Sequence, residues 1–169
     1  MILIVVLIYA PIWSSVAAPL NSATKIHSKR GDPNAYDLPH FIQCPTGQGL
    51  YRLRSAHRND YEDRYFDYAC RVVTADPVTC TWTGYVNAFD EPISFMCPKN
   101  QYLAGVQSYH RNGYEDRRFK FQCCASSQLK SQECFLTGFW NNYDQYIDYT
   151  APIGWIFAGT ASVHSNPYE

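Results

Sequence analysis

The chain has 169 residues, with 14 Lys and Arg against 15 Asp and Glu, so its formal net charge is −1. This balance excludes a globally basic nucleic-acid-binding protein and a protein with a polyanionic tail. Fourteen tyrosines, nine phenylalanines and four tryptophans stand beside only two methionines. Aromatic residues favour the half-buried surface of a sheet, so the composition favours a β-rich fold.

The first 18 residues carry no charged side chain and are almost wholly apolar up to Ile12. This run is too short to cross a bilayer, and it ends in small residues at 14–18, as a secretory leader does. We expect residues 1–18 to be a signal peptide, cleaved after Ala17 or Ala18. A signal anchor is the alternative, because the segment lacks Lys and Arg. We therefore expect a secreted protein that matures in an oxidising compartment, with no membrane span in the mature chain.

Residues 19–39 are polar, contain three of the ten prolines and show no helix or strand period, which predicts an extended N-terminal arm. Within this arm, Arg30, Gly31 and Asp32 form a tripeptide of the integrin-binding type. They are therefore a candidate cell-attachment site. The alternative is a dibasic processing site at Lys29-Arg30, which would split the tripeptide.

The remainder, residues 40–169, repeats itself. Residues 44–45 recur as 97–98, and the segment 57–64 recurs as 110–117, each 53 residues later. A third copy starts at 158–169, which matches 104–115 at an offset of 54, and the chain stops inside that copy. We therefore expect the third copy to be incomplete and truncated at its C-terminal end, before its own Asp-Arg pair and one further cysteine.

Within each copy the pattern is that of two strands around a polar turn. Phe119, Phe121 and Cys123 alternate with polar residues, which is the period of a half-buried strand, and residues 66–70 repeat this alternation. A preceding strand is expected over 103–109, with 110–115 as the connection. The fold class we predict is all-β, with three related units of about 53 residues. Our hypothesis for their arrangement is a pseudo-threefold axis, as in a trefoil.

Two six-residue segments in these repeats, 63–68 and 116–121, have the form Asp-Arg-x-aromatic-x-aromatic. The second is followed by Cys123-Cys124. In this the chain resembles the dermatopontin family of secreted matrix proteins, over roughly residues 36–169. The Tyr-Glu-Asp-Arg segments are similar to the branch with invertebrate haemagglutinin and amebocyte aggregation factor. The chain departs from the family pattern in lacking a third Asp-Arg-x-Trp element and the cysteine-bearing tail that follows it.

The seven cysteines leave one without a partner. Cys44 and Cys70 are 26 residues apart, as are Cys97 and Cys123, so a repeated geometry gives Cys44–Cys70 and Cys97–Cys123. Cys80 can then pair with Cys124, and an exchange of Cys123 and Cys124 between these bonds is the alternative. Cys134 is expected to be unpaired, because its partner would lie in the missing tail. A reactive or intermolecular cysteine is the competing interpretation.

The polar turn is the element that recurs in all three copies, although a core requires only apolar positions to recur. Ser, His, Asn and Glu with neighbouring aromatic rings suit sugar contact, whereas the Asp-Arg pairs also suit a structural network. A three-histidine metal site on the symmetry axis is a further alternative, although the sequence has no paired ligand spacing and we expect no metal. The candidate ligand-binding residues are Ser55, His57, Asn59, Glu62, Asp63, Arg64, Ser108, His110, Asn112, Glu115, Asp116, Arg117, Ser162, His164, Asn166 and Glu169.

The resemblance to the dermatopontin family implies a protein secreted into the extracellular matrix, with a matrix or cell-adhesion role, that binds matrix polysaccharide, glycosaminoglycan or proteoglycan, including in a mineralised matrix. An integrin-type receptor and a second copy of the chain are further candidate partners. The alternative function is a defence lectin that binds sugars through several copies of the turn and agglutinates cells. The chain has no P-loop, G-x-S-x-G or H-E-x-x-H motif, so we expect neither an enzyme nor a cofactor.

Overall fold

The computed structural model describes residues 2–9, 36–130 and 133–165. The elements in these residues are all strands, so the all-β prediction is confirmed. No helix of the described chain is long and apolar enough to cross a membrane. The strands are β1 Ile2–Tyr9, β2 His40–Gln43, β3 Gln48–Arg58, β4 Asp63–Val72, β5 Val78–Trp82, β6 Ser94–Met96, β7 Gln101–Arg111, β8 Asp116–Ser126, β9 Glu133–Phe139, β10 Ile147–Thr150 and β11 Trp155–Val163.

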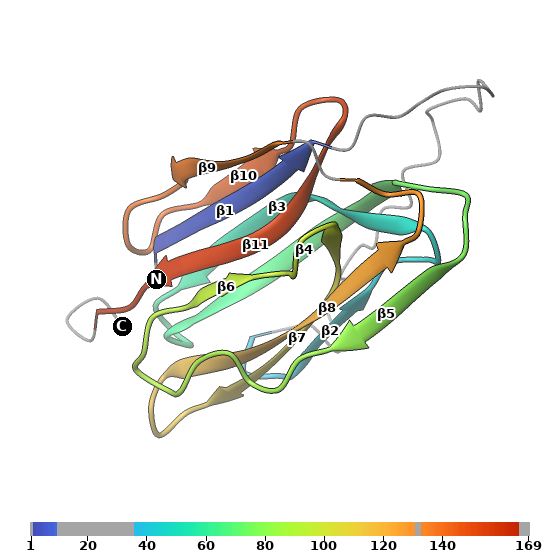
Figure 1. Ribbon diagram of the computed structural model, residues 1–169. Coiled ribbons are helices and arrows are strands. Elements are labelled where there is room, and N and C mark those ends of the chain that lie inside the picture. Colours follow the sequence, from blue (N-terminus) through green and yellow to red (C-terminus); the bar gives the residue numbers. More distant parts are fainter. Residues whose placement is uncertain (1, 10–35, 131–132, 166–169) are drawn as a thin grey trace.

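These strands form three sheets, with the orders β10-β3-β4, β2-β7-β8-β5 and β6-β11-β1-β9 (Figure 1). Each sheet is built on a long strand, β3, β7 or β11, that pairs antiparallel with its neighbours. The short strands come from elsewhere in the chain: β2 pairs with β7, β6 with β11 and β10 with β3. These three pairings tie each sheet to a distant segment of the sequence.

The hairpins β3–β4 and β7–β8 have the alternation that the sequence predicts. Phe119, Phe121 and Cys123 are buried on β8, as Phe66 is on β4. In each hairpin a backbone hydrogen bond closes the turn, at 3.0 Å from the amide of residue 61 and 2.9 Å from that of residue 114. Both first strands contain a bulge, at residues 51 and 104, and β11 has one at residue 158. Bulges increase the local twist, which helps these long strands to curve around the core.

Aromatic rings from several strands fill the core. The Phe66 and Phe119 rings meet edge to face with centroids 5.8 Å apart, and Phe95 stacks on Phe121 at 5.0 Å. Tyr102, in the same core, is completely buried. Edge-to-face and offset stacking are the preferred geometries of aromatic pairs, so this part of the core is held in a defined arrangement.

Three disulfides join the strands, and they have the predicted pairing: Cys44–Cys70, Cys97–Cys123 and Cys80–Cys124. The exchange of Cys123 and Cys124 is therefore not what the structure adopts. Cys134, on β9, is exposed and forms no disulfide. Disulfides of this number fit a protein from an oxidising compartment.

The N-terminal predictions fall largely outside the described residues. Residues 10–35 hold most of the expected arm, including Arg30, Gly31 and Asp32, and the cleavage site; the arm's described end, residues 36–38, forms a turn. Residues 2–9, within the expected leader, form β1 between β11 and β9 (Figure 1). The signal peptide and the attachment site stay predictions.

Candidate functional site

Three histidines lie at corresponding ends of the long strands, each beneath acidic side chains. The side chains of His57, His110 and His164 are 6%, 0% and 8% exposed. Two carboxylates approach each ring at 3.5–3.8 Å between nitrogen and oxygen: Glu62 and Asp144 for His57, Asp37 and Glu115 for His110, and Asp90 and Asp116 for His164.

Five of these acidic residues have positive φ angles, which do not occur in regular strands. Asp37, Asp90 and Asp144 have φ of 62°, 62° and 60°, and Glu62 and Glu115 have φ of 43° and 45°. Left-handed conformations are tolerated by Asp but are uncommon for Glu. These turns aim the carboxylates at the histidine rings, and each contact is an ion pair only when the histidine is protonated. Burial lowers the pKa of His57 and so opposes its protonation.

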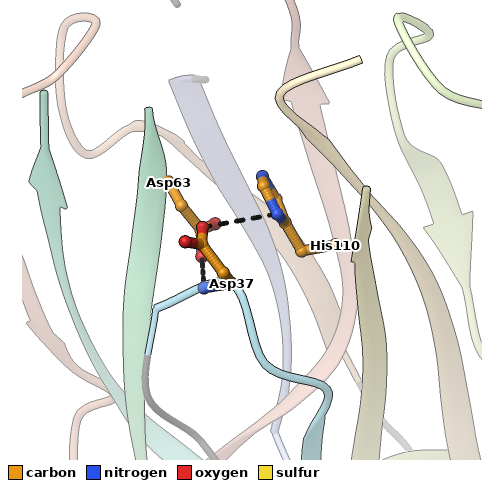
Figure 2. Close-up of side chains that lie close together, drawn as sticks. All are labelled: Asp37, Asp63 and His110. Atoms are coloured by element: carbon orange, nitrogen blue, oxygen red, sulfur yellow. Dashed lines mark hydrogen bonds and ion pairs between the residues drawn. The ribbon is translucent and has the colours of Figure 1, made fainter. Parts of the chain in front are cut away.

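A buried ion pair joins the β3–β4 hairpin to the β7–β8 hairpin. Arg117 donates from Nε and Nη2 to the two oxygens of Asp63, at 2.6 and 2.5 Å, and the side chains are 4% and 2% exposed. Burial raises the pKa of Asp63, but the hydrogen bonds and charge of Arg117 outweigh it and hold that pKa below its usual value. Asp63 also accepts a hydrogen bond from the Asp37 amide at 2.9 Å, close to His110 (Figure 2).

Among the described residues, two groups bring potential metal ligands within 4.8 Å of one another: Asp37, Asp63 and His110, and Asp90, Asp116 and His164. In the first group both oxygens of Asp63 already bind the guanidinium of Arg117. A metal cation there would lie against that fixed positive charge, so the first group fits a structural ion-pair network better than a metal.

The predicted contact residues divide by exposure. Seven are buried, and the side chains of His57, His164 and Asp116 are nearly so, at 6%, 8% and 11% exposure. The two asparagines and two glutamates of the first two turns reach the surface. Two more, Asn166 and Glu169, lie outside the described residues. Sugar contact through the turn stays a prediction, and only its exposed members are open to a ligand without rearrangement. The seven are Ser55, Asp63, Arg64, Ser108, His110, Arg117 and Ser162, and the exposed or half-exposed members are Asn59, Asn112, Glu62 and Glu115.

A surface of cations and aromatic rings on β8 was not among the predicted sites. Arg118 lies over the Tyr85 ring at 4.2 Å from its centroid, and the Lys120 ammonium lies 4.6 Å from the same ring. Phe89 stacks on Tyr114 at 4.8 Å. We call this surface the Tyr85 patch; its residues are Tyr85, Phe89, Arg111, Tyr114, Arg118 and Lys120.

The sequence held one signal for this patch. Arg118 and Lys120 alternate with the buried Phe119 and Phe121, which predicts that they face outward. Nothing in the sequence placed Tyr85, from the segment after β5, beneath them. The equivalent positions on β4 hold an aromatic and an acidic residue, Tyr65 and Asp67, so these cations are particular to β8.

Residues 34–169 match the family model for dermatopontin. The chain belongs to the dermatopontin family. No solved structure matches the chain significantly.

Three relatives of this dermatopontin-family chain are each 34% identical to it. Millepora cytotoxin-1 of Millepora dichotoma aligns over 146 residues, 86% of this chain and 64% of that protein. The hemagglutinin/amebocyte aggregation factor of Limulus polyphemus aligns over 138 residues, 80% of each chain. Dermatopontin of Biomphalaria glabrata aligns over 131 residues, 78% of this chain and 88% of that one. The chain thus spans just under two thirds of the Millepora protein.

Proposed function

We propose that this chain is an extracellular matrix protein that binds acidic polysaccharide through the Tyr85 patch. Arg111, Arg118 and Lys120 carry the proposal. Each lies over an aromatic ring, and none of them pairs with a carboxylate within 4.0 Å among the described residues. Three available cations on one face are a local positive surface on a chain of net charge −1.

The arginines of β3 offer less unpaired positive charge than the Tyr85 patch. On β3, Arg52 and Arg54 both lie against Asp148 of β10, at 2.9 and 3.5 Å, and Arg58 at the strand end pairs with Asp60. Their positive charge is largely balanced by these carboxylates. A sulfated or carboxylated polymer is therefore attracted more strongly to β8 than to β3.

The aromatic part of the patch suits a sugar polymer for a second reason. Tyr85 and Tyr114 are 44% and 41% exposed, so their rings can stack on the apolar face of a sugar ring. The cations over these rings are held in place by cation–π attraction, which lowers the entropy lost when they bind sulfate. The patch thus combines a stacking surface with positioned anion donors.

The test is binding of the secreted protein to immobilised chondroitin sulfate, with desulfated chondroitin as the ligand control. Replacing Arg118 and Lys120 together by Ala should weaken binding about tenfold, because two charge contacts of surface strength add to roughly 1.4 kcal/mol. Raising the salt concentration should weaken the wild type more than this variant.

The matched control replaces two exposed lysines outside the patch, Lys99 and Lys130, by Ala, and should bind as the wild type does. If the control pair and the patch pair lose the same affinity, binding depends on overall charge and the proposal is wrong. Equal binding to sulfated and desulfated polymer would also contradict it.

A second candidate function, agglutination of cells as a defence lectin, is favoured by a surface feature that occurs twice. At the end of each complete hairpin an arginine lies over the exposed ring of a stacked aromatic pair, with ring centroids 5.1 or 4.8 Å apart. Two equivalent contacts let one molecule bridge two ligands. The residues are Tyr36, Tyr61 and Arg58 at the first turn, and Phe89, Tyr114 and Arg111 at the second.

Red-cell agglutination by the pure protein, with and without competing free sugar, separates the two functions. Replacing Tyr61 or Tyr114 alone by Ala should leave a monovalent protein that binds sugar but does not agglutinate. Agglutination by the double variant at the wild-type concentration would contradict the lectin function.

We also infer that the three sheets are three related units about a pseudo-threefold axis. The support lies in the pairing: β2, β6 and β10 follow one another at offsets of 53 or 54 residues, and each pairs with the long strand of a different sheet in cyclic order. The bulges at residues 51, 104 and 158 have the same spacing. In this arrangement β1 lies where the third unit would place the equivalent of β4 and β8.

A further inference from the structure

The turn between β7 and β8 contains an Asn-Gly pair, Asn112-Gly113, and no other asparagine of the sequence is followed by glycine. Both residues are exposed. The residue after an asparagine controls how readily the asparagine side chain reacts with the next backbone nitrogen, because a side chain at that position shields the nitrogen. Glycine has no Cβ, so it leaves the nitrogen open to attack.

Little in the fold holds these two reacting groups apart. The amide of Tyr114 donates to the carbonyl oxygen of Arg111 at 2.9 Å and closes the turn around them. Within the part of the chain that the structure describes, neither the side chain of Asn112 nor the amide of Gly113 makes a hydrogen bond. A methyl group added to Gly113 would meet no atom within 4 Å, so the space beside its backbone is open. The Asn112 side chain can therefore reach the Gly113 nitrogen without breaking another contact.

We propose that Asn112 is a site of spontaneous deamidation and that the products of this reaction weaken the Tyr85 patch. The backbone nitrogen of Gly113 gives up its proton and forms a bond to Cγ of Asn112. The bond from Cγ to the side-chain nitrogen breaks, and ammonia leaves with that proton. Water then opens the resulting cyclic imide at one of its two carbonyl carbons. The products are aspartate and isoaspartate, and the reaction needs neither an oxidant nor an enzyme.

The first turn, at the end of β3, shows what a carboxylate does at this place. There Asp60 stands where the second turn has Gly113, and it pairs with Arg58 at 2.5 Å. The equivalent Arg111 has no carboxylate within 4.0 Å among the described residues, so its charge is available to a ligand. Deamidation gives the second turn an acidic group as well, on the residue that directly follows Arg111.

Both products oppose the binding of acidic polysaccharide, and this step rests on the proposed function. The new negative charge lowers the summed charge of the patch from three positive charges to two. It adjoins Arg111, well inside the screening length of about 10 Å at 0.1 M salt. Isoaspartate also adds a carbon to the backbone inside the turn that the Tyr114 amide closes. This carbon loosens the position of the Tyr114 ring, on which Phe89 stacks.

The first measurement is peptide mapping by mass spectrometry of the secreted protein after incubation in mildly alkaline buffer, which promotes loss of the amide proton. The peptide with Asn112 should show the mass change of NH₂ replaced by OH, and an isoaspartyl methyltransferase should then methylate it. The comparison within the same molecule is Asn59, which lies in the equivalent turn but precedes Asp60. Gly113→Ala should keep Asn112 intact for longer. Conversion of Asn112 no faster than that of Asn59, or equally fast in Gly113→Ala, would overturn the proposal.

The second measurement is binding of Asn112→Asp to immobilised chondroitin sulfate. Its affinity should be about threefold weaker than that of the fresh wild type, the effect of one charge contact at the surface. The incubated wild type should lose more than this, because isoaspartate also lengthens the turn. The control Asn59→Asp makes the same charge change at the other turn and should bind as the wild type does.

The outcomes separate this proposal from the proposed function. Wild-type affinity in Asn112→Asp, beside weakened binding of the variant that lacks Arg118 and Lys120, would overturn the effect of deamidation and leave the polysaccharide proposal standing. If the fresh wild type does not bind the sulfated polymer, the polysaccharide proposal is wrong, whereas the mass measurement still decides whether Asn112 deamidates.

Discussion

The ion pair between Asp63 and Arg117 gives the sharpest test of how the hairpins are held together. Asp63→Asn leaves Arg117 buried at 3% exposure without a compensating charge and replaces one of its acceptors by an amide NH₂ group. Breaking a buried pair on one side costs about 3–5 kcal/mol. A domain of this size has about 5–15 kcal/mol of stability in total. The variant should therefore lose about a fifth or more of its free energy of unfolding.

The measurement is urea unfolding with the disulfides intact, beside the matched variant Asp60→Asn. Asp60 binds Arg58 at 2.5 Å, the same distance as the shortest contact of the buried pair, but these side chains are 74% and 50% exposed. The two ion pairs differ in how much they stabilise the fold because they differ in exposure, not in distance. Asp60→Asn should therefore unfold as the wild type does. Equal stability of the two variants would refute the reasoning.

The same ion pair makes the stability of the fold depend on pH in the acid range. Because the pKa of Asp63 is lower in the folded than in the unfolded chain, its stabilisation is complete above the unfolded value of about 4. It is lost as the pH falls through the lower, folded value. The wild type should therefore lose its advantage over Asp63→Asn as the pH is lowered below about 4. An unchanged difference down to pH 2 would contradict this assignment.

Three further predictions concern other parts of the chain. Cys134 is exposed and outside the three disulfides, so a maleimide should label the native, unreduced monomer once per chain, and two or more labels would contradict the disulfide pairing. Asp116→Asn should raise the free energy of unfolding at pH 7, because a folded pKa above the unfolded one means that ionisation opposes folding; a stability loss in urea would contradict this. Gly159→Ala should lower the free energy of unfolding by about 1–3 kcal/mol, because the added methyl group would lie 2.5 Å from the Phe95 carbonyl oxygen. The control Gly113→Ala meets no atom within 4 Å and should unfold as the wild type does. Equal unfolding midpoints for the two variants would contradict the packing of β6 on β11.

The local structure of this chain could be predicted because it depends on residues that are close together in the sequence. Alternation of Phe119 and Phe121 with polar residues identifies β8, and the repeated spacing of 26 residues identifies Cys44–Cys70 and Cys97–Cys123. The partners of the short strands could not be predicted in this way. Strand pairing across the chain depends on which faces meet in three dimensions, and a repeat in the sequence does not state that β10 pairs with β3.

The candidate site shows the corresponding limit for function. Ser108 and Arg117 recur in the repeats as a surface ligand site would, but they are buried and bind each other at 3.0 Å. Repetition alone does not distinguish a network that fixes the turns from a surface that binds sugar. The Tyr85 patch was missed for the opposite reason, because Lys120 and Tyr85 meet only after β8 and the segment following β5 come together.

The most direct test of the proposed function is an NMR titration of the secreted protein with a sulfated chondroitin tetrasaccharide. The largest saturable shifts should fall on the Tyr85 patch, above all at Tyr85, Arg118 and Lys120, and should diminish when the tetrasaccharide is desulfated. Shifts centred on His57 and His110, with the patch unmoved, would contradict binding at the patch and place sugar binding in the repeated turn instead.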